Sequence, residues 1–373
     1  MISLNSTERV LSAIYLEEPD IVPWFDSIDL RVLAGIFGEK MFKRRSGSIQ
    51  NTRNELQDHP FSWDNVVKAH AKLGIDFVFD GAIFDPAYNI KLDETHYVNE
   101  WGRIHTTQQL GDISDGYIGG YLDVPEKWDA FNFAPPVTEW RMEVFDLAKK
   151  LADKYNLCLL AACGSIMEVG MEAVGIMPFI KYLYKNPEFI RKVFRHCSEY
   201  TLELGKAYAD AGADVLMIFD DYAYHSGPFL SPKLWREYIL PWNKKVLSSL
   251  HKKGLPVVLH ACGDIRPLMD GIIESGYDAV QPLEATANMT LKETKERWGD
   301  KICLIGNIDI NTLSLGTVQD VEKEVRGAIK DAAQGGGYML GSSHGIYHSC
   351  KPENVLKMSE VKKKYGIYHK IHH

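Results

Sequence analysis

The sequence predicts a single (β/α)8 barrel, known as the TIM barrel, and three observations carry that prediction. Eight short apolar runs recur along the 373 residues. Most of these runs are apolar at every position, whereas a half-buried strand would alternate apolar and polar residues. Continuous apolar character is typical of parallel strands covered on both faces. Helical patterns separate the later runs, and polar residues end almost every run, as at the mouth of a barrel. The expected strands cover residues 21–28, 77–84, 157–166, 214–221, 256–262, 279–285, 302–309 and 337–345, and helices are expected over 188–211, 231–253, 265–275 and 317–333.

An open, doubly wound sheet is the alternative to the barrel. The dinucleotide-binding form of that fold carries a G-x-G-x-x-G turn after its first strand, and no such turn follows residues 21–28 here. The barrel therefore remains the preferred architecture.

Composition indicates an ordinary globular chain. Apolar residues make up 45% and charged residues 25%, and no repeat or linker divides the sequence, so one domain over residues 1–373 is expected. The formal net charge of −8 argues against a general nucleic-acid binder. No apolar run approaches the roughly 20 residues that span a bilayer. The six cysteines are widely spread, which favours reduced thiols and a cytoplasmic location.

Three segments complete the expected order of elements. Asn5 and Glu8 have the spacing of a capping box, so a helix is expected to begin directly after Asn5. Residues 89–107 combine strand formers with turn formers, which predicts a β-hairpin inserted after the second strand. Residues 116–136 are rich in glycine, proline and aromatics and are expected to form a long loop.

Acidic, imidazole and thiol groups gather at the ends of the expected strands. Chemistry in such barrels gathers at the carboxyl ends of the strands. Some of these residues are expected only to cap the following helices, Asn307 or Asp309 above all. The strand-end residues are Asp26, Asp80, Ser165, Glu168, Asp220, Asp221, His260, Cys262, Glu284, Asn307, Asp309 and His344.

His260 and Cys262 are the leading metal-ligand candidates. They stand two residues apart at the end of an apolar strand, so their side chains point the same way. Imidazole nitrogen and thiolate sulfur are ligands that zinc takes readily, although a core histidine beside an inert cysteine gives the same pattern. A third ligand is needed, and His344, Cys350 and Glu284 are the candidates from later in the chain.

A second cluster surrounds the paired carboxylates Asp220 and Asp221. Together with Glu168 they are catalytic candidates, because paired carboxyls can act as general acids or accept substrate hydrogen bonds. The structural alternative is that one caps a helix while the other orients a ligand histidine. Substrate-contacting candidates are the aromatic residues Trp24, Tyr222 and Tyr224, with Asp80.

These motifs, in this order, resemble the uroporphyrinogen decarboxylase superfamily. That superfamily also contains zinc-dependent methyltransferases that act with methylated corrinoid proteins, and the resemblance implies a TIM barrel. The matching stretches are Asn99-Glu100-Trp101-Gly102, Ile218-Phe219-Asp220-Asp221, Gly227-Pro228-Phe229-Leu230-Ser231-Pro232, His260-Ala261-Cys262-Gly263-Asp264, Gln281-Pro282-Leu283-Glu284-Ala285, and the region from Gly335 to Val355 that includes His344-Gly345-Ile346.

The methyltransferase branch is the closer match. True decarboxylases have an arginine-containing R-Q-A-G-R stretch near the N-terminus, whereas residues 21–30 contain no arginine and carry Asp26 and Asp29. These aspartates would repel a substrate with many carboxylates. Asp80 lies near the place of the decarboxylase's essential aspartate.

The resemblance implies zinc held by His260, Cys262 and a late cysteine. The alignment places His344 at that late position and Cys350 six residues beyond, so the third ligand is His344 or Cys350, with Glu284 as an extra ligand. The implied function is methyl transfer between a small substrate and cobalamin carried by a partner corrinoid protein. A metal-free decarboxylase and a barrel that only binds a ligand are the alternatives. The sequence identifies neither the methyl donor nor the direction of transfer.

Overall fold

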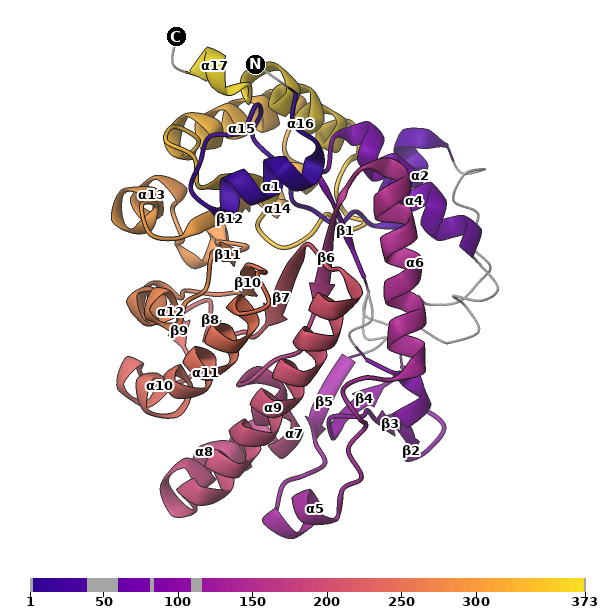
Figure 1. The fold of residues 1–373 in the computed structure, drawn as a ribbon, viewed down its shortest axis with the longest axis vertical. Helices are drawn as coiled ribbons and strands as arrows, with labels where there is room; N and C mark the ends of the chain where they lie inside the picture. Colours follow the sequence, from indigo (N-terminus) through magenta and orange to yellow (C-terminus); the bar gives the residue numbers. More distant parts are fainter. Residues whose placement is uncertain (1–2, 39–59, 81–83, 109–115, 372–373) are drawn as a thin grey trace.

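Seven parallel strands form one curled sheet in the computed structural model, which describes residues 3–38, 60–80, 84–108 and 116–371 (Figure 1). Every neighbouring pair in this sheet is parallel. Each strand falls within one of the expected runs; residues 81–83 of the run expected at 77–84 lie outside the described residues. In sheet order the strands are β1 (Phe77–Phe79), β6 (Cys158–Ala162), β7 (Val215–Phe219), β10 (Val257–His260), β11 (Ala279–Gln281), β12 (Cys303–Ile308) and β13 (Tyr338–Ser342).

The segment at residues 21–28 occupies the gap between β13 and β1. Phe25 N donates to Leu340 O over 2.7 Å, and Leu340 N donates to Pro23 O over 2.9 Å. On the other side, Asp76 N donates to Trp24 O over 3.1 Å. Only isolated bridges form here, where a full strand was expected; Pro23 has no N–H to give to a ladder. The fold is a TIM-barrel-like α/β structure, with seven regular strands in the parallel sheet of the described residues.

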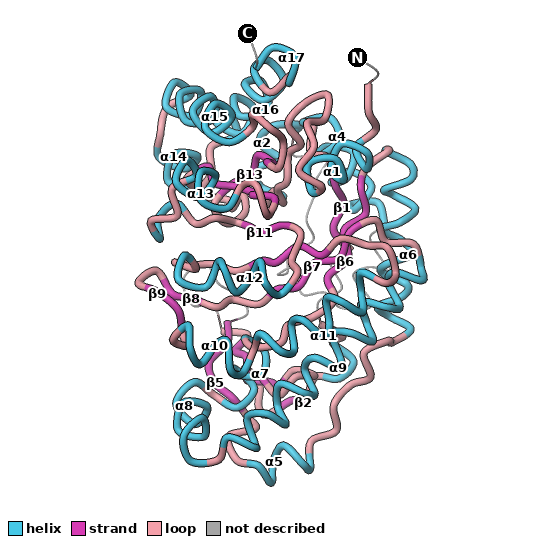
Figure 2. The backbone as a smooth tube through the Cα atoms, turned by 60° about the vertical axis from the view of Figure 1, so that its left-hand side comes forward, coloured by secondary structure: helices cyan, strands magenta, loops and turns pink. Residues whose placement is uncertain are grey.

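Helices cover the outside of the sheet (Figure 2). The first begins after Asn5 with the expected capping box to Glu8. The single helix expected over 231–253 was wrong, because two helices, α10 and α11, form there. Pro241 lies in the first turn of α11, where a missing N–H is tolerated. Inside one long helix the same proline would remove a backbone hydrogen bond. The α-helices are α1 (Ser6–Ile14), α2 (Leu30–Phe37), α4 (Pro60–Leu73), α5 (Pro125–Ala130), α6 (Glu139–Tyr155), α7 (Glu168–Val174), α8 (Ile176–Lys185), α9 (Pro187–Ala211), α10 (Pro232–Tyr238), α11 (Leu240–His251), α12 (Met269–Ser275), α13 (Leu291–Trp298), α14 (Ile310–Leu315), α15 (Val318–Ala332), α16 (Pro352–Tyr365) and α17 (Tyr368–Ile371).

A second, antiparallel sheet lies between β1 and β6 in the chain. Where a hairpin over 89–107 was expected, four strands pair in the order β2-β3-β4-β5. Its last strand and α5 both fall in the segment expected to be a loop. The four strands are β2 (Ile90–Lys91), β3 (His96–Val98), β4 (Arg103–Thr106) and β5 (Gly116–Gly120), and a separate two-stranded ribbon contains β8 (Ala223–Tyr224) and β9 (Gly227–Pro228).

Glycine lets this second sheet approach the barrel closely. A Cβ atom at Gly120 would lie 2.2 Å from the backbone nitrogen of Gly175, at the start of α8. Leu122 N, just after β5, donates to Ala173 O in α7 over 2.9 Å. The sheet is therefore fixed to α7, the helix that follows β6.

Buried charge ties the N-terminal helix to the barrel. Asp76 accepts hydrogen bonds from Arg9 (2.6 Å), Ser6 (3.0 Å) and the backbone N–H of Trp24 (2.9 Å), and it pairs with Lys362 of α16 (3.2 Å). These hydrogen bonds and ion pairs offset the free-energy cost of burying the Asp76 carboxylate.

Two further features of the described part of the chain bear on the expectations. All six cysteines are free thiols. No described helix combines the length and apolar character needed to cross a membrane.

Candidate metal centre at the barrel mouth

Imidazole, thiol and carboxylate groups converge where β7, β10, β11 and β13 end. Cys262 Sγ lies 3.6 Å from His260 Nε2 and 3.7 Å from His344 Nδ1. Two overlapping sets of ligand atoms, each with all members within 4.8 Å of one another, are formed by Asp221, His260 and Cys262 and by Cys262, Glu284 and His344. Cys262 is common to both, so the thiol stands at the centre of the cluster.

Gln281 fixes the orientation of the first imidazole. His260 ends β10, and its Nδ1 makes a short hydrogen bond to Gln281 Oε1 at the end of β11. A carbonyl oxygen at Nδ1 favours the tautomer with the proton on that nitrogen. The lone pair of Nε2 then faces Cys262 and Asp221, the latter at 3.9 Å. This is the outer support that metal-binding histidines commonly have.

Glu284 supports the second imidazole. Its Oε1 lies 3.4 Å from His344 Nε2, which leaves His344 Nδ1 directed at Cys262. The same carboxylate accepts hydrogen bonds from Gly263 N (2.8 Å) and Thr286 Oγ1 (2.7 Å). Glu284 is therefore placed either to ligate a metal ion or to hold His344 in position.

The two adjacent aspartates have different surroundings. Asp220 is fully buried and accepts from Ser165 Oγ (2.8 Å), Met167 N (2.8 Å) and Glu168 N (2.7 Å), so it caps the start of α7. Burial raises the pKa of Asp220 to about 6, against the lowering effect of these donors. Asp221 points instead to the cluster, where it accepts from Cys262 N over 2.7 Å.

Glu168 lies behind Asp221. Its Oε2 accepts from the backbone nitrogen of Asp221 over 3.1 Å. Burial, followed by the nearby charge of Asp221, raises the pKa of Glu168. Glu168 is therefore suited to hold a proton near neutral pH.

The electrostatic surroundings of Cys262 disfavour a free thiolate. Burial raises the pKa of the thiol, and the charges of Asp221, Glu284 and Glu168 add to that effect. Burial also lowers the pKa of His260. A divalent cation among these groups would favour the deprotonated thiol instead, because a bound cation stabilises the thiolate and takes neutral imidazoles as ligands. The donor set, with nitrogen, sulfur and oxygen, fits zinc.

Cys350 lies outside the cluster. Its buried thiol contacts Ser314 Oγ at 3.6 Å, and no described grouping of ligand atoms includes it. Of the two candidates for the third ligand, His344 is the one that the structure brings to Cys262.

The four substrate-contacting candidates are scattered. Trp24 is fully buried, with its indole nitrogen donating to Asp26 Oδ2 over 2.7 Å. Tyr222 is also buried, and its hydroxyl accepts from Asn243 over 3.0 Å. Local packing explains these two rings without a ligand. Asp80 is buried and accepts from Ala162 N (3.1 Å), whereas Tyr224 is 62% exposed.

Sequence reasoning missed several neighbours of the cluster. Gln281 belongs to a quoted motif, yet its role depends on the parallel register of β10 and β11. Phe219 ends β7 and packs its ring 4.9 Å from the His260 ring. Arg103 comes from the second sheet and pairs with Glu172 of α7 over 2.5 Å. Nothing in the local sequence places Arg103 near the barrel mouth.

Known proteins share both sequence and fold with this chain. The family model for uroporphyrinogen decarboxylase (URO-D) matches residues 120–365. The uroporphyrinogen decarboxylase of Syntrophotalea carbinolica is 27% identical over 188 residues, which cover 50% of this chain and 52% of that relative. The enzyme of Chlorobium luteolum is 28% identical over 260 residues, which cover 66% of this chain and 69% of that relative. The chain thus spans about half the length of the first relative.

Solved structures extend the likeness to nearly the whole chain. A methyltransferase from Methanosarcina mazei superposes with a TM-score of 0.72 at 20% identity, covering 97% of this chain and 99% of that one. A B12-independent methionine synthase from Shewanella superposes with a TM-score of 0.50 at 14% identity, covering 84% and 90%. At these identities the likeness establishes the fold.

Proposed function

The chain belongs to the uroporphyrinogen decarboxylase family, and from that premise we propose that it is a zinc-dependent methyltransferase acting with a corrinoid protein. The observation that carries the proposal is the convergence of Cys262 Sγ with His260 Nε2 and His344 Nδ1 within 3.7 Å. Decarboxylases and the Methanosarcina methyltransferase share this fold, so the side chains at the mouth must decide between the reactions.

His260, Cys262 and His344 would hold the zinc, with Glu284 or Asp221 as a fourth ligand or as an outer support. When bound there, zinc supplies a Lewis acid that activates the sulfur, oxygen or nitrogen atom of the methylated or accepting substrate. Gln281 keeps Nε2 of His260 available, and Asp221 positions the backbone N–H of Cys262.

The surrounding residues would orient the substrate and manage protons. Glu168, with its raised pKa, is placed to donate a proton beside Asp221 or to receive one. Asp220 would act indirectly, since its hydrogen bonds hold the first turn of α7, which begins at Glu168. The methyl group would move between the substrate and cobalamin on the corrinoid partner, which would dock at the barrel mouth.

The test is spectroscopic. Purified protein supplied with zinc and methylcobalamin, or with reduced cobalamin and candidate methyl donors, is expected to change the cobalamin absorption spectrum. Cys262→Ala should abolish the change, whereas Cys350→Ala, which removes a thiol outside the cluster, should retain it. A spectrum unaffected by every donor and acceptor would contradict the proposal.

A decarboxylase of this family is the second candidate, favoured by the family model and by the curated relatives. Residues 21–30 contain no arginine that could pair with the carboxylates of a polycarboxylate substrate. Carbon dioxide release from uroporphyrinogen by the Cys262→Ala variant would support this alternative, since that reaction needs no zinc.

A further inference from the structure

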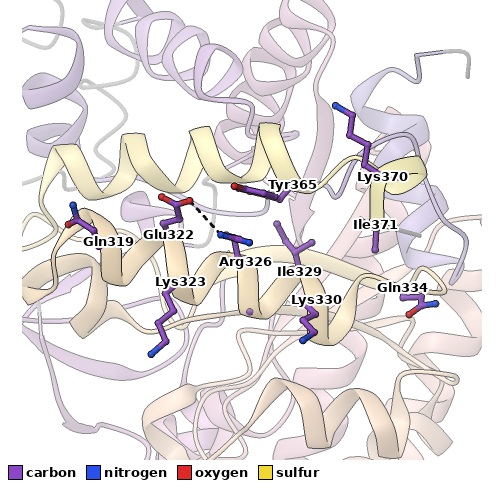
Figure 3. A pocket seen from close by; sticks show the side chains of 11 residues that line it. Gln319, Glu322, Lys323, Arg326, Ile329, Lys330, Gln334, Tyr365, Lys370 and Ile371 are labelled. Atoms are coloured by element: carbon purple, nitrogen blue, oxygen red, sulfur yellow. Dashed lines mark ion pairs between the residues drawn. The ribbon is translucent and has the colours of Figure 1, made fainter. Parts of the chain in front are cut away.

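A cavity of about 860 Å³ lies on the outside of the barrel, between α15, the end of α16 and α17 (Figure 3). None of its lining residues belongs to the metal cluster. We call it the α15–α17 groove. Its volume falls in the range of sites that accept small organic ligands.

The side chains that line the groove are mainly cationic, although the chain as a whole is acidic. Lys323, Arg326, Lys330 and Lys370 line it, and among the described lining residues Glu322 is the one carboxylate. Glu322 lies 3.9 Å from Arg326 and is partly neutralised by it. The whole chain carries a formal charge of −8, so this local excess of cations is not a property of the surface at large.

One wall of the groove is flat and aromatic. The Arg326 guanidinium lies 4.5 Å from the centre of the Tyr365 ring, and Figure 3 shows these two side chains together in the middle of the groove. Lys323 and Lys330 extend from α15, while Lys370 comes from α17. Their long, flexible stems allow the ammonium groups to turn toward a ligand.

Gly327 leaves the backbone of α15 accessible at the groove. It lies in the interior of α15, where glycine destabilises a helix relative to alanine. A Cβ atom there would meet nothing within 4 Å, so packing among the described residues does not require glycine. Glycine at such a place does permit close approach of a bound molecule to the helix backbone.

We propose that the α15–α17 groove binds a phosphate-bearing small molecule. The phosphates would lie among Lys323, Lys330 and Lys370, whose compact charges suit a multiply charged anion. Any planar part of the ligand would lie against the Arg326 guanidinium, which itself lies over the Tyr365 ring. Free pyrophosphate and a nucleotide share this chemistry, and the proposal does not depend on methyl transfer.

Calorimetric titration of the full chain with pyrophosphate and with ATP, both without magnesium, tests the proposal. The double variant Lys323→Glu/Lys330→Glu is expected to weaken binding about tenfold or more. The matched control is Lys206→Glu/Lys252→Glu, which changes the net charge equally at exposed sites on other elements and should bind as the wild type does. If ATP binds more tightly than pyrophosphate, and Tyr365→Leu removes that difference, the ligand is a nucleotide. If ATP and pyrophosphate bind with equal affinity, the groove recognises the phosphate group alone.

Gly327 supplies a test with effects of opposite sign. Gly327→Ala should raise the melting temperature of the free protein yet weaken anion binding, and Gly327→Leu should weaken binding further. The proposal is overturned if neither anion binds, if the two double variants lose affinity equally, or if Gly327→Leu binds as tightly as the wild type.

Discussion

Gln281 contacts no metal in the proposed centre, yet it controls which nitrogen of His260 is available. Replacing it with leucine removes the acceptor at Nδ1, and the loss of such a support typically lowers metal affinity by about 10–100-fold. Competition with a chromophoric chelator should measure this loss in Gln281→Leu. Gln281→Glu keeps an acceptor and should retain most of the affinity; equal affinity in wild type and Gln281→Leu would show that the hydrogen bond has no such role.

His70 gives the protein a stability that depends on pH. Its Nε2 is buried in α4 and has no hydrogen-bond partner among the described residues, and burial lowers the pKa of His70 to about 4. Because the folded-state pKa lies below the unfolded value of about 6.5, protonation favours unfolding. The contribution is fully present above pH 6.5 and is lost as the pH falls toward 4, by up to about 3 kcal/mol.

Urea unfolding at several pH values tests this assignment. Between pH 7 and pH 4, His70→Leu should lose less unfolding free energy than the wild type does. His369→Leu, which removes an exposed histidine, should follow the wild-type pH dependence. Parallel curves for wild type and His70→Leu would disprove the role of His70.

The attachment of the second sheet to the barrel depends on Gly120. A Cβ atom there would lie 2.2 Å from Gly175 N, and backbone cannot yield as a flexible side chain can. Gly120→Ala is therefore expected to cost about 2 kcal/mol of unfolding free energy or more. Gly119→Ala is the matched control, because a Cβ atom at Gly119 meets nothing within 4 Å. Similar stabilities of the two variants would mean that the contact is not tight.

The regular elements were largely predictable, because apolar runs mark buried parallel strands whatever surrounds them. The second sheet was not: β5 contains three glycines, which are typical of a loop, and nine residues separate it from β4, too many for the short turn that marks a hairpin in a sequence. The segment at 21–28 has strand-like composition, but its backbone partners change along its length, from Asp76 and β13 to Ile346.

The candidate site was predictable only in part. His260 and Cys262 were found because a strand turns alternate residues to one side. The choice between His344 and Cys350 needed the path of the loop after β13, which carries His344 to Cys262 and Cys350 to Ser314. Gln281 and Arg103 depend on strand register and on the second sheet, neither of which local patterns specify.

Across the whole molecule, the acidic mouth and the basic α15–α17 groove give the barrel two chemically different surfaces. Asp221, Glu168 and Glu284 surround the cluster at the mouth, and lysines from α15 and α17 line the groove. High salt should weaken anion binding at the groove strongly and zinc binding at the partly buried cluster much less.

Zinc content per chain tests the central claim most directly. Protein produced with zinc and purified without chelators should contain about one zinc per chain, as a single site requires. Cys262→Ala and His344→Ala should lose the metal while remaining folded, and Cys350→Ala should retain it. Metal-free wild-type protein, or zinc that is lost from Cys350→Ala and kept by Cys262→Ala, would contradict the account.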